Sequence, residues 1–403
     1  MRLMTQLLPT VLVAAIGCRD PSLAPTTGGG AHRSFDVLAS AACPATATFT
    51  VTDEAGFRAA LAAATPGDVI AVDGTIAITA DDSIFTDDLT ITCATPGSGL
   101  VATGNGVFDM LTIGAKGVVV DGLVLDGSQA GDSPFFAMND GVTFFAQDVR
   151  FTNNTVTCTP VGLCVFFAGG LRPVVRDNSF QSPGAASGIQ LQANGPDPTA
   201  AVLPFRIDGA RIERNTIVAT IRSGGGGEFG AFGAIRPFEA DDVVIADNVV
   251  TGPWQRGISV TRLSGSRISG NQIQGALLDG FHTSAALFLP TRPVSGNLFV
   301  NNVVTGAGRA GAFVHFACTN QFLANNLQGN AGGLGVFFDE LTGANVVVGP
   351  ANAVVIDNGA FDCDRDGDTD PNILRGIAAG RGANPTTGAS DPMPITRRGI
   401  VLQ

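Results

Sequence analysis

The sequence predicts an all-β protein wound as a parallel β-helix, and three observations lead to this prediction. An asparagine recurs behind short runs of alternating apolar and polar residues. Alternation over a few residues indicates half-buried strands, and no unit contains the apolar period of a helix. The composition, with 53 glycines, 45% hydrophobic residues and 14% charged residues, suits many tight turns around one long core. We therefore expect one elongated domain of stacked coils.

The recurring asparagine defines the repeat. It occurs as Asn154, Asn178, Asn215, Asn248, Asn271, Asn302, Asn326 and Asn358. Successive gaps are 24, 37, 33, 23, 31, 24 and 32 residues, which indicates a unit of about 23 residues with insertions of up to about 14. We expect two or three short strands in each unit and about ten or eleven coils, stacked about 4.8 Å apart.

Asparagine suits such a turn because its short side chain tolerates the left-handed backbone conformation and bonds to nearby main chain. Amides at the same place on successive coils can also bond to one another and form a ladder. Ordinary turn asparagines would leave the repeated spacing unexplained. We therefore expect these residues to be structural and not catalytic.

From about residue 50 to about residue 375, this pattern resembles the right-handed parallel β-helix proteins of the pectin lyase-like superfamily. Residues 57–70 add to the resemblance, because they read as an amphipathic helix, a Pro-Gly-Asp turn and a first strand. The resemblance implies right-handed coils and a helix that caps the N-terminal end of the solenoid. Such a cap would cover apolar core and unpaired strand edges. The resemblance implies an architecture and not a reaction.

Residues 1–17 read as a signal peptide, because their apolar run is too short to span a bilayer. The residues that end at Cys18 resemble the lipobox of bacterial lipoproteins, which implies cleavage and acylation of this cysteine. Ordinary signal-peptidase cleavage is the alternative. Residues 18–42 are rich in Pro, Thr, Gly and Ser and predict a disordered tether.

The β-helix domain is then expected over residues 43–375. Residues 376–403 form a predicted C-terminal tail, rich in Gly, Ala, Thr and Pro at its start. Its end, residues 397–403, is a candidate strand on the last coil.

Six cysteines remain after Cys18, and an even number in an exported chain favours disulfides. They are Cys43, Cys93, Cys158, Cys164, Cys318 and Cys363. About fifteen pairings are open to six cysteines. Their positions favour three pairs. Cys158 and Cys164 share a short loop, Cys43 and Cys93 flank the cap region, and Cys318 and Cys363 lie in the last coils. No CxxC pair is present, so we expect no zinc site.

Counting from the asparagines places two polar residues together. His315 lies 13 residues after Asn302, and Asp339 lies 13 residues after Asn326. We expect them to be outward-facing neighbours on adjacent coils. A carboxylate beside an imidazole can act as an acid/base unit. It can equally be an ordinary cross-strand charge pair.

Arg236 is the arginine that we expect to complete a catalytic group with His315 and Asp339. Other charged residues could line the same groove, although solvated surface charge is an equally simple role for them. They are Glu239, Arg262, Asp279 and His282.

The familiar motifs of pectin-degrading enzymes are absent or weak. The polygalacturonase strings do not occur, and Arg172-Pro173 resembles the arginine-proline motif of pectate lyases only faintly. Arg-Pro also occurs at residues 236–237 and 292–293, so a repeated turn into a strand explains it. The net charge of −12 repels polyuronates and nucleic acids unless a metal or a local basic strip intervenes. We expect no nucleic-acid partner.

An acidic loop near the C-terminus resembles a calcium loop. Its carboxylates are Asp362, Asp364, Asp366, Asp368 and Asp370. Carboxylates at alternate positions followed by a glycine match the first half of an EF-hand-type loop, but Ile373 stands where a bidentate glutamate is expected. The loop is more similar to the aspartate-rich repeats of thrombospondin type 3. We expect calcium to bind here as a structural clamp, with a solvated acidic turn as the alternative.

Together these features predict an exported, lipid-anchored monomer at the outer membrane or cell surface, which touches the membrane only through its anchor. A secreted or periplasmic protein is the alternative location. We expect it to bind a polysaccharide ligand or to act structurally at the cell envelope. The alternative function is a polysaccharide lyase or glycoside hydrolase that uses His315, Asp339 and Arg236, so catalysis is left open.

Overall fold

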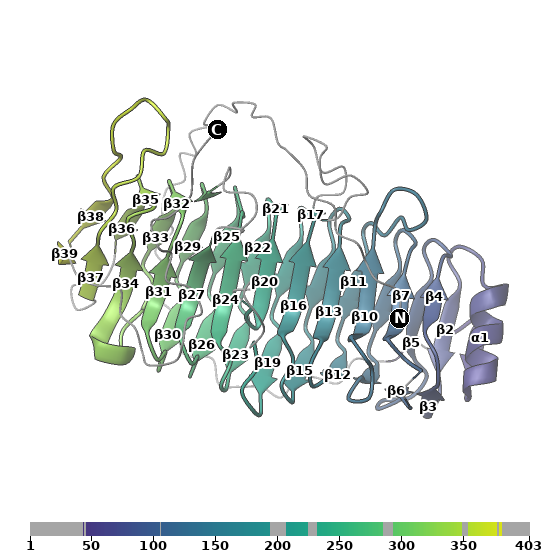
Figure 1. Cartoon of the computed structure of the whole chain (residues 1–403). Coiled ribbons are helices and arrows are strands. Elements are labelled where there is room, and N and C mark those ends of the chain that lie inside the picture. The colour runs from purple at the N-terminus through teal and green to yellow at the C-terminus, as the bar shows by residue number, and fades with distance from the viewer. Residues whose placement is uncertain are drawn as a thin grey trace.

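The computed structural model describes residues 43, 46–104, 106–193, 207–224, 232–284, 293–348, 354–376 and 379–380. The predicted signal peptide, Cys18, the tether and most of the predicted tail lie outside these residues. The described chain folds as a right-handed parallel β-helix, whose coils form a row in Figure 1. Within this part of the chain, no helix is long and apolar enough to cross a membrane.

Three parallel sheets form the walls of the solenoid. The first has 13 strands, in spatial order β1 (Phe49–Val51), β2 (Val69–Val72), β5 (Thr90–Cys93), β8 (Val119–Asp121), β11 (Arg150–Thr152), β14 (Val174–Arg176), β18 (Arg211–Glu213), β22 (Val244–Ala246), β25 (Arg267–Ser269), β29 (Leu298–Val300), β33 (Gln321–Leu323), β36 (Val346–Val348) and β38 (Ile373–Arg375).

The second sheet has 12 strands, which are β4 (Asp82–Ile84), β7 (Asp109–Ile113), β10 (Ser133–Met138), β13 (Leu163–Ala168), β16 (Ser187–Gln192), β20 (Ile235–Phe238), β24 (Arg256–Thr261), β27 (Asp279–Ser284), β31 (Ala310–Val314), β34 (Leu334–Phe338), β37 (Val354–Asp357) and β39 (Ala379–Gly380). This sheet has more strands than the ten or eleven coils expected.

The third sheet has nine strands, which are β3 (Thr75–Ile78), β6 (Gly99–Ala102), β9 (Val124–Asp126), β12 (Thr155–Thr157), β15 (Ser179–Ser182), β19 (Thr216–Ala219), β23 (Val249–Thr251), β26 (Gln272–Gln274) and β30 (Val303–Thr305). Two small sheets lie at one corner, and they contain β17 (Ile207–Asp208) with β21 (Ala240–Asp241), and β28 (Val294–Ser295) with β32 (Ala317–Cys318) and β35 (Thr342–Gly343).

The one α-helix of the described residues, α1 (Glu54–Ala63), lies at the N-terminal end of the row of coils (Figure 1). The side chain of Asp53 accepts a hydrogen bond from the N–H of Gly56 at 2.7 Å, so the helix begins with an ordinary N-cap. Phe57 is fully buried and belongs to the same core as the first coils. A 3₁₀ turn, η1 (Ala331–Gly333), precedes β34.

The expected asparagine ladder is present, and it runs over seven coils. Its members are Asn154, Asn178, Asn215, Asn248, Asn271, Asn302 and Asn325, all at most 6% exposed. Each amide donates from Nδ2 to Oδ1 of the next, as Asn215 does to Asn248 at 2.9 Å. The same Nδ2 also donates to a main-chain carbonyl of the preceding coil, which for Asn215 is Val175 at 2.9 Å. The ladder therefore satisfies buried polar groups on three successive coils.

Two details of the expected ladder were wrong. Asn325, and not Asn326, is the last member, because Asn326 is exposed and Asn358 follows β37 in a different sheet. The left-handed backbone conformation belongs to the residue before each ladder asparagine, such as Arg214 with a φ of 54°. The asparagine itself only supplies the amide.

A second ladder, which sequence reasoning missed, lies at the corner of the small sheets. It joins Asn297, Asn320, Asn345 and Asn372 through Nδ2-to-Oδ1 bonds of 2.9 Å each. Its members follow shorter and less regular strands, so no alternating phrase marks them in the sequence. The later coils are thus held by two ladders at two different turns.

The described residues contain three disulfides, and they join the cysteine pairs that the sequence favoured: Cys43 with Cys93, Cys158 with Cys164, and Cys318 with Cys363. The first links the residue that opens the described chain to β5. The third ties β32 to the acidic loop. Both terminal regions of the solenoid are therefore covalently held.

The neighbouring residues Asn325 and Asn326 allow a direct test of the ladder. Asn325→Ala removes the partners of the buried N–H of Asn302 and carbonyl of Phe299. We expect the free energy of unfolding to fall by roughly 2–4 kcal/mol, because both groups are left unsatisfied. Asn326→Ala should change it by less than about 0.5 kcal/mol. Chemical denaturation measures both, and equal losses would contradict the assignment.

Candidate functional site

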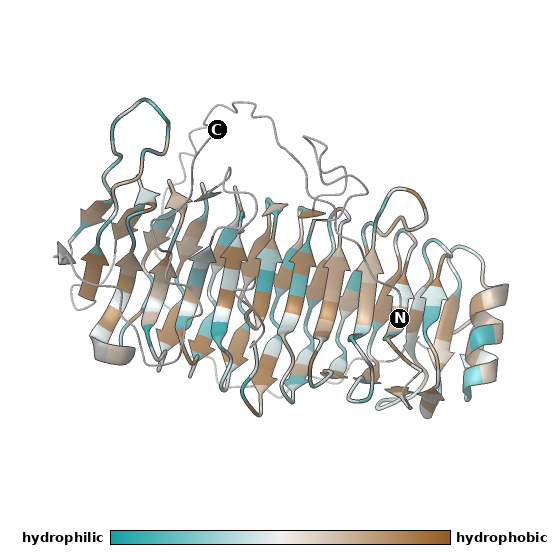
Figure 2. Cartoon of the chain, viewed as in Figure 1, coloured by the Kyte–Doolittle hydropathy of each residue, from teal (hydrophilic) through white to brown (hydrophobic). Residues whose placement is uncertain are grey.

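The outward face of the 12-stranded sheet carries a row of side chains that runs along the solenoid. Inward positions such as Phe135, Ile189 and Phe281 enter the core. The alternate outward positions align from coil to coil and form what we call the central row: Phe136, Phe166, Gln190, Arg236, Ser259, His282, Phe313 and Phe337. The row is aromatic at both ends and polar in its middle. Hydrophilic positions interrupt the hydrophobic strands near the middle of the row of coils in Figure 2.

A second outward row lies two residues further along each strand and holds the expected histidine and aspartate. Thr261 pairs with Ser284, and the next strands bring His315 opposite Asp339. Nδ1 of His315 contacts Oδ2 of Asp339 within hydrogen-bonding distance. Their side chains are 16% and 19% exposed, so both can be reached from solvent.

The counting that paired these two residues contained a compensating error. The ladder member is Asn325, one residue earlier than Asn326, and the chain from there to Asp339 is one residue longer than in the previous coil. These two differences cancel, so His315 and Asp339 lie together as expected although the count started from Asn326 and not from Asn325.

The main chain of His315 is held by the coil before it. The hydroxyl of Thr283 donates to the carbonyl of His315 at 2.8 Å and accepts from its N–H at 2.8 Å. These bonds fix where the imidazole leaves the sheet.

A second histidine, His282 of the central row, belongs to a more tightly bound charged group. Nδ1 of His282 lies 3.1 Å from Oδ2 of Asp279, and Arg309 donates through Nε and Nη2 to the two oxygens of the same carboxylate. Nε of Arg256 lies 3.8 Å from Asp279. The ring of Phe313 stacks on His282 and lies 3.9 Å beneath the guanidinium of Arg309. We call Arg256, Asp279, His282 and Arg309 the charged cluster.

The charged cluster has a definite protonation state near neutral pH. Burial raises the pKa of Asp279, but the hydrogen bonds and charges of Arg309 and His282 outweigh it and lower this pKa to about 2. Burial and the charge of Arg256 lower the pKa of His282 to about 3. An ionised carboxylate can only accept, so Nδ1–H of His282 donates to it and Nε2 keeps its lone pair.

Arg236 also lies in the central row, but it does not meet the His315 pair. Three strand spacings separate β20 from β31, or about 14 Å. The structure therefore brings His315 and Asp339 together and leaves Arg236 apart from them. Of the other candidates, Arg262 is paired with Glu239, and Arg172 is paired with Asp148 on an exposed turn.

The sequence placed Asp279 with His282 among the candidate groove residues but did not indicate Arg309, Gln190 or Ser259. The three-residue spacing between Asp279 and His282 was the only local pattern that could have indicated the charged cluster. Arg309 comes from the next coil, 30 residues away, and its place depends on an insertion whose length no motif reveals.

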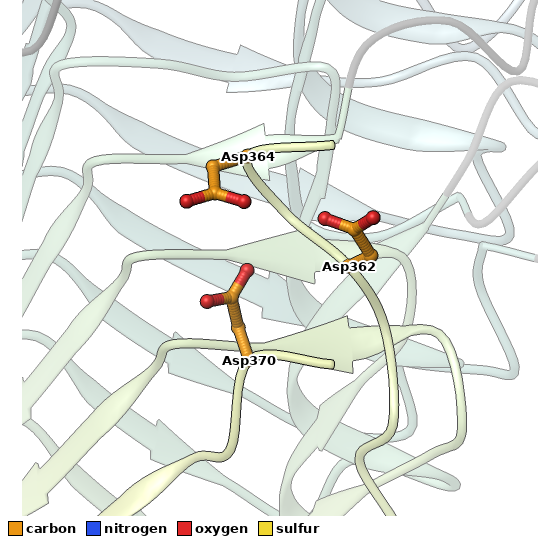
Figure 3. Close-up of side chains that lie close together, drawn as sticks. All are labelled: Asp362, Asp364 and Asp370. Carbon is orange, nitrogen blue, oxygen red and sulfur yellow. The ribbon is translucent and has the colours of Figure 1, made fainter. Parts of the chain in front are cut away.

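The acidic loop projects from the last coils, between β37 and β38 (Figure 1). Three of its five aspartates, Asp362, Asp364 and Asp370, each bring a carboxylate oxygen within 4.8 Å of the others (Figure 3). Asp366 and Asp368 are not part of this group. Oxygen donors at this spacing fit a calcium ion, so calcium binding stays a prediction with three protein ligands in place of five.

The carboxylates of this loop affect one another. The charge of Asp366 is the largest cause of the raised pKa of Asp368. The N–H of Asp366 lowers the pKa of Asp364, but burial and the charges of Asp366, Asp370 and Asp362 outweigh it and raise this pKa. A cation among these side chains would relieve the repulsion.

Comparisons with known proteins agree with the fold. A family model described as right handed beta helix region matches residues 206–359. The A-module of the mannuronan C-5 epimerase AlgE6 of Azotobacter vinelandii is similar in structure, with 16% identity and a TM-score of 0.58, over 82% of this chain and 95% of that chain. Comparison with curated proteins finds no match.

Two further solved structures are similar to the chain. A PL6 alginate lyase in complex with a trisaccharide shares 15% identity and has a TM-score of 0.57, over 82% of this chain and 77% of that chain. The A-module of the A. vinelandii mannuronan C-5 epimerase AlgE4 shares 15% identity, with a TM-score of 0.55, over 84% of this chain and 95% of that chain. At such identities the likeness shows the fold alone.

Removing the carboxylate of the charged cluster should greatly lower the free energy of unfolding. Asp279→Asn leaves two buried arginines without their carboxylate, and we expect the free energy of unfolding to fall by about 3–5 kcal/mol. Asp177→Asn, which breaks an exposed pair with Arg214, should cost less than about 1 kcal/mol. Because the pKa of Asp279 is lowered from 3.8 to about 2, its contribution is present above pH 3.8 and is lost as the pH falls through about 2. Urea titrations at several pH values would measure both effects.

The three converging carboxylates of the acidic loop indicate that calcium should stabilise the folded protein. We expect millimolar Ca²⁺ to raise the melting temperature, and Asp364→Asn to abolish the rise because it weakens one of the three converging ligands. Asp368→Asn removes the same charge outside the group and should keep most of the rise. Differential scanning fluorimetry with Ca²⁺ and with a chelator tests this, and a parent protein that does not respond would remove the calcium prediction.

Proposed function

We propose that this protein binds a polysaccharide along the outward face of its 12-stranded sheet. The observation that carries the proposal is the central row, in which one side chain from each coil aligns from Phe136 to Phe337. Coils repeat about every 4.8 Å, so the row offers regularly spaced contacts. A linear ligand with its own repeat can meet such contacts at several coils at once.

The chemistry of the row also suits a sugar chain. Phe136 and Phe166 stack with centroids 5.1 Å apart and are half-buried, so part of each ring can contact a ligand. Between the aromatic ends, the row holds the hydrogen-bonding side chains of Gln190, Ser259 and His282. These are at most 6% exposed, so Phe136 and Phe166 are the more accessible part of the row. Ligand sites commonly combine apolar surface with a few placed polar groups.

The similar structures support a glycan ligand by analogy of fold. They are described as mannuronan C-5 epimerase modules and as an alginate lyase in complex with a trisaccharide, so each is named for a reaction on a polysaccharide. Fold analogy alone does not transfer a reaction. It does make the long face of the solenoid the first place to look for a ligand.

We infer export from the three disulfides, since these persist in oxidising compartments. In this proposal acylation of Cys18 holds the solenoid at the outer membrane or cell surface, and residues 18–42 act as a tether. The protein acts as a monomer, and the lipid anchor is its only contact with the membrane. Secretion or a periplasmic location remains the alternative.

A second candidate function is hydrolysis or lysis of a polysaccharide by His315 and Asp339. The observation that favours it is their contact on the same face, where the carboxylate can orient the imidazole. Three strand spacings, or about 14 Å, separate the strand of Arg236 from β31, which ends just before His315. In such an enzyme Arg236 would therefore bind the ligand at another part of the face. Binding without turnover needs neither His315 nor Asp339.

One experiment distinguishes the two functions. The full chain is incubated with a panel of acidic and neutral polysaccharides, and retention in affinity electrophoresis, unsaturated-product absorbance and new reducing ends are followed. Binding without products supports the proposal, and Phe166→Ala should then weaken retention about threefold to tenfold, because aromatic contacts contribute about 1 kcal/mol. Arg214→Gln, in the turn that follows β18 of the 13-stranded sheet, is the control and should not weaken retention.

Products that disappear in both His315→Ala and Asp339→Ala would instead establish the enzyme. No retention and no products with any polymer would contradict both functions.

A further inference from the structure

Arg236 is a buried cation with no counter-ion in the described part of the chain. Its side chain is 6% exposed, and among the described residues no carboxylate lies within ion-pairing distance of it. Burial lowers the pKa of Arg236 to about 10, so the guanidinium stays charged at neutral pH. Leaving a buried charge unpaired is costly, and folded proteins rarely do so without a reason.

The surroundings hold this guanidinium in one place and leave part of it unused. Nη1 donates to Oε1 of Gln190 at 3.1 Å, and Nε2 of Gln190 donates to Gln192 at 3.0 Å, so Gln192 orients the amide that Arg236 needs. The rings of Phe232 and Phe238 lie 4.3 and 5.1 Å from the guanidinium carbon. Nε of Arg236 has no hydrogen-bond partner.

A second unsatisfied donor lies on the next coil. The register of β20 with β24 places Arg236 opposite Ser259. Ser259 is fully buried, and its hydroxyl has no partner within the described chain. Two donors without acceptors, on facing positions of neighbouring strands, are what an acceptor from outside would satisfy.

Among the residues that the structure describes, no acidic side chain near Arg236 is free to neutralise it. Glu239 is paired with Arg262. Asp279 lies two strands away and is bound by Arg309 and His282. Among the described residues, Arg236, Arg256 and Arg309 lie near one another on this face, where Asp279 is the carboxylate that binds Arg309, although the whole chain carries a net charge of −12. An acidic protein repels polyanions unless such a basic strip intervenes.

We propose that Arg236 and Ser259 form a binding site for an oxyanion, either a carboxylate or a sulfate ester, carried by one sugar unit of the ligand. The site rests on the proposed function and names its substrate class as an acidic glycan. Gln190 and the two phenyl rings hold the guanidinium, and the anion supplies the acceptors that the unpaired donors lack. Guanidinium groups bind carboxylates and sulfates through paired, charge-assisted hydrogen bonds.

The test uses polymers that differ only in charge: polygalacturonate with its methyl-esterified form, and dextran sulfate with dextran. We expect the full chain to bind at least one charged member, at least tenfold more tightly than its neutral partner. Arg236→Met should weaken that binding by about tenfold or more, and Ser259→Ala by a few-fold, with little change for the neutral polymers. Arg214→Gln, an exposed site with the same change of net charge, should leave the preference intact.

The unliganded stability of Arg236→Met separates a binding role from a structural one. Methionine keeps much of the contact with Phe232 and Phe238 and removes an unpaired buried charge, so the melting temperature should be unchanged or higher. A lower melting temperature together with unchanged affinity for the charged polymers would overturn the inference. Equal binding of charged and neutral polymers would also overturn it, while leaving the proposed function standing.

Failure of every polymer to bind would contradict the proposed function, and small anions then decide the site. Free D-glucuronate and inorganic sulfate, at constant ionic strength, should raise the melting temperature of the parent protein and not that of Arg236→Met. The absence of any difference between the two proteins would overturn the oxyanion site as well.

Discussion

The structure depends on register between coils, and the buried amides of the two ladders are what hold it. A strand in a parallel sheet could slip along its neighbour, because backbone groups are alike at every position. The side chain of Asn248 cannot slip, since it accepts from Asn215 and donates to Asn271 and to the carbonyl of Ile212. Displacement by one residue would leave several buried polar groups unpaired, which costs more than most single interactions contribute.

The ladder fixes the register of successive coils at one turn. The lengths of the connections that follow then decide which outward positions of the 12-stranded sheet face one another. The central row is a consequence of this alignment. It brings Phe136 and Phe337 into one line although they lie about 200 residues apart in the chain.

The same alignment creates two different kinds of buried charge on one face. Arg309 meets Asp279 from the adjacent coil, and these two charges are paired in place. Arg236 meets Gln190 and Ser259, which carry no charge, and no described residue balances its charge. The pairing of Arg309 with Asp279 stabilises the folded chain, whereas Arg236 and Ser259 have donors that a bound anion could satisfy. A binding function on this face is therefore best sought at Arg236, whose buried charge no described residue balances.

The sequence by itself determined the β-helix and its period, because both depend on local patterns: alternation in strands and amides at turns. It also favoured the three cysteine pairs that the structure contains, from their positions along the chain, while about fifteen pairings were open. It also placed His315 beside Asp339, since both lie a short count from a ladder turn. It could not distinguish Asn325 from Asn326, reveal the second ladder, or assemble Arg309 with Asp279. Those outcomes were decided by the tertiary structure, because they depend on the lengths of the connections between coils. A single extra residue in a connection changes which side chains face one another, and no local pattern records it.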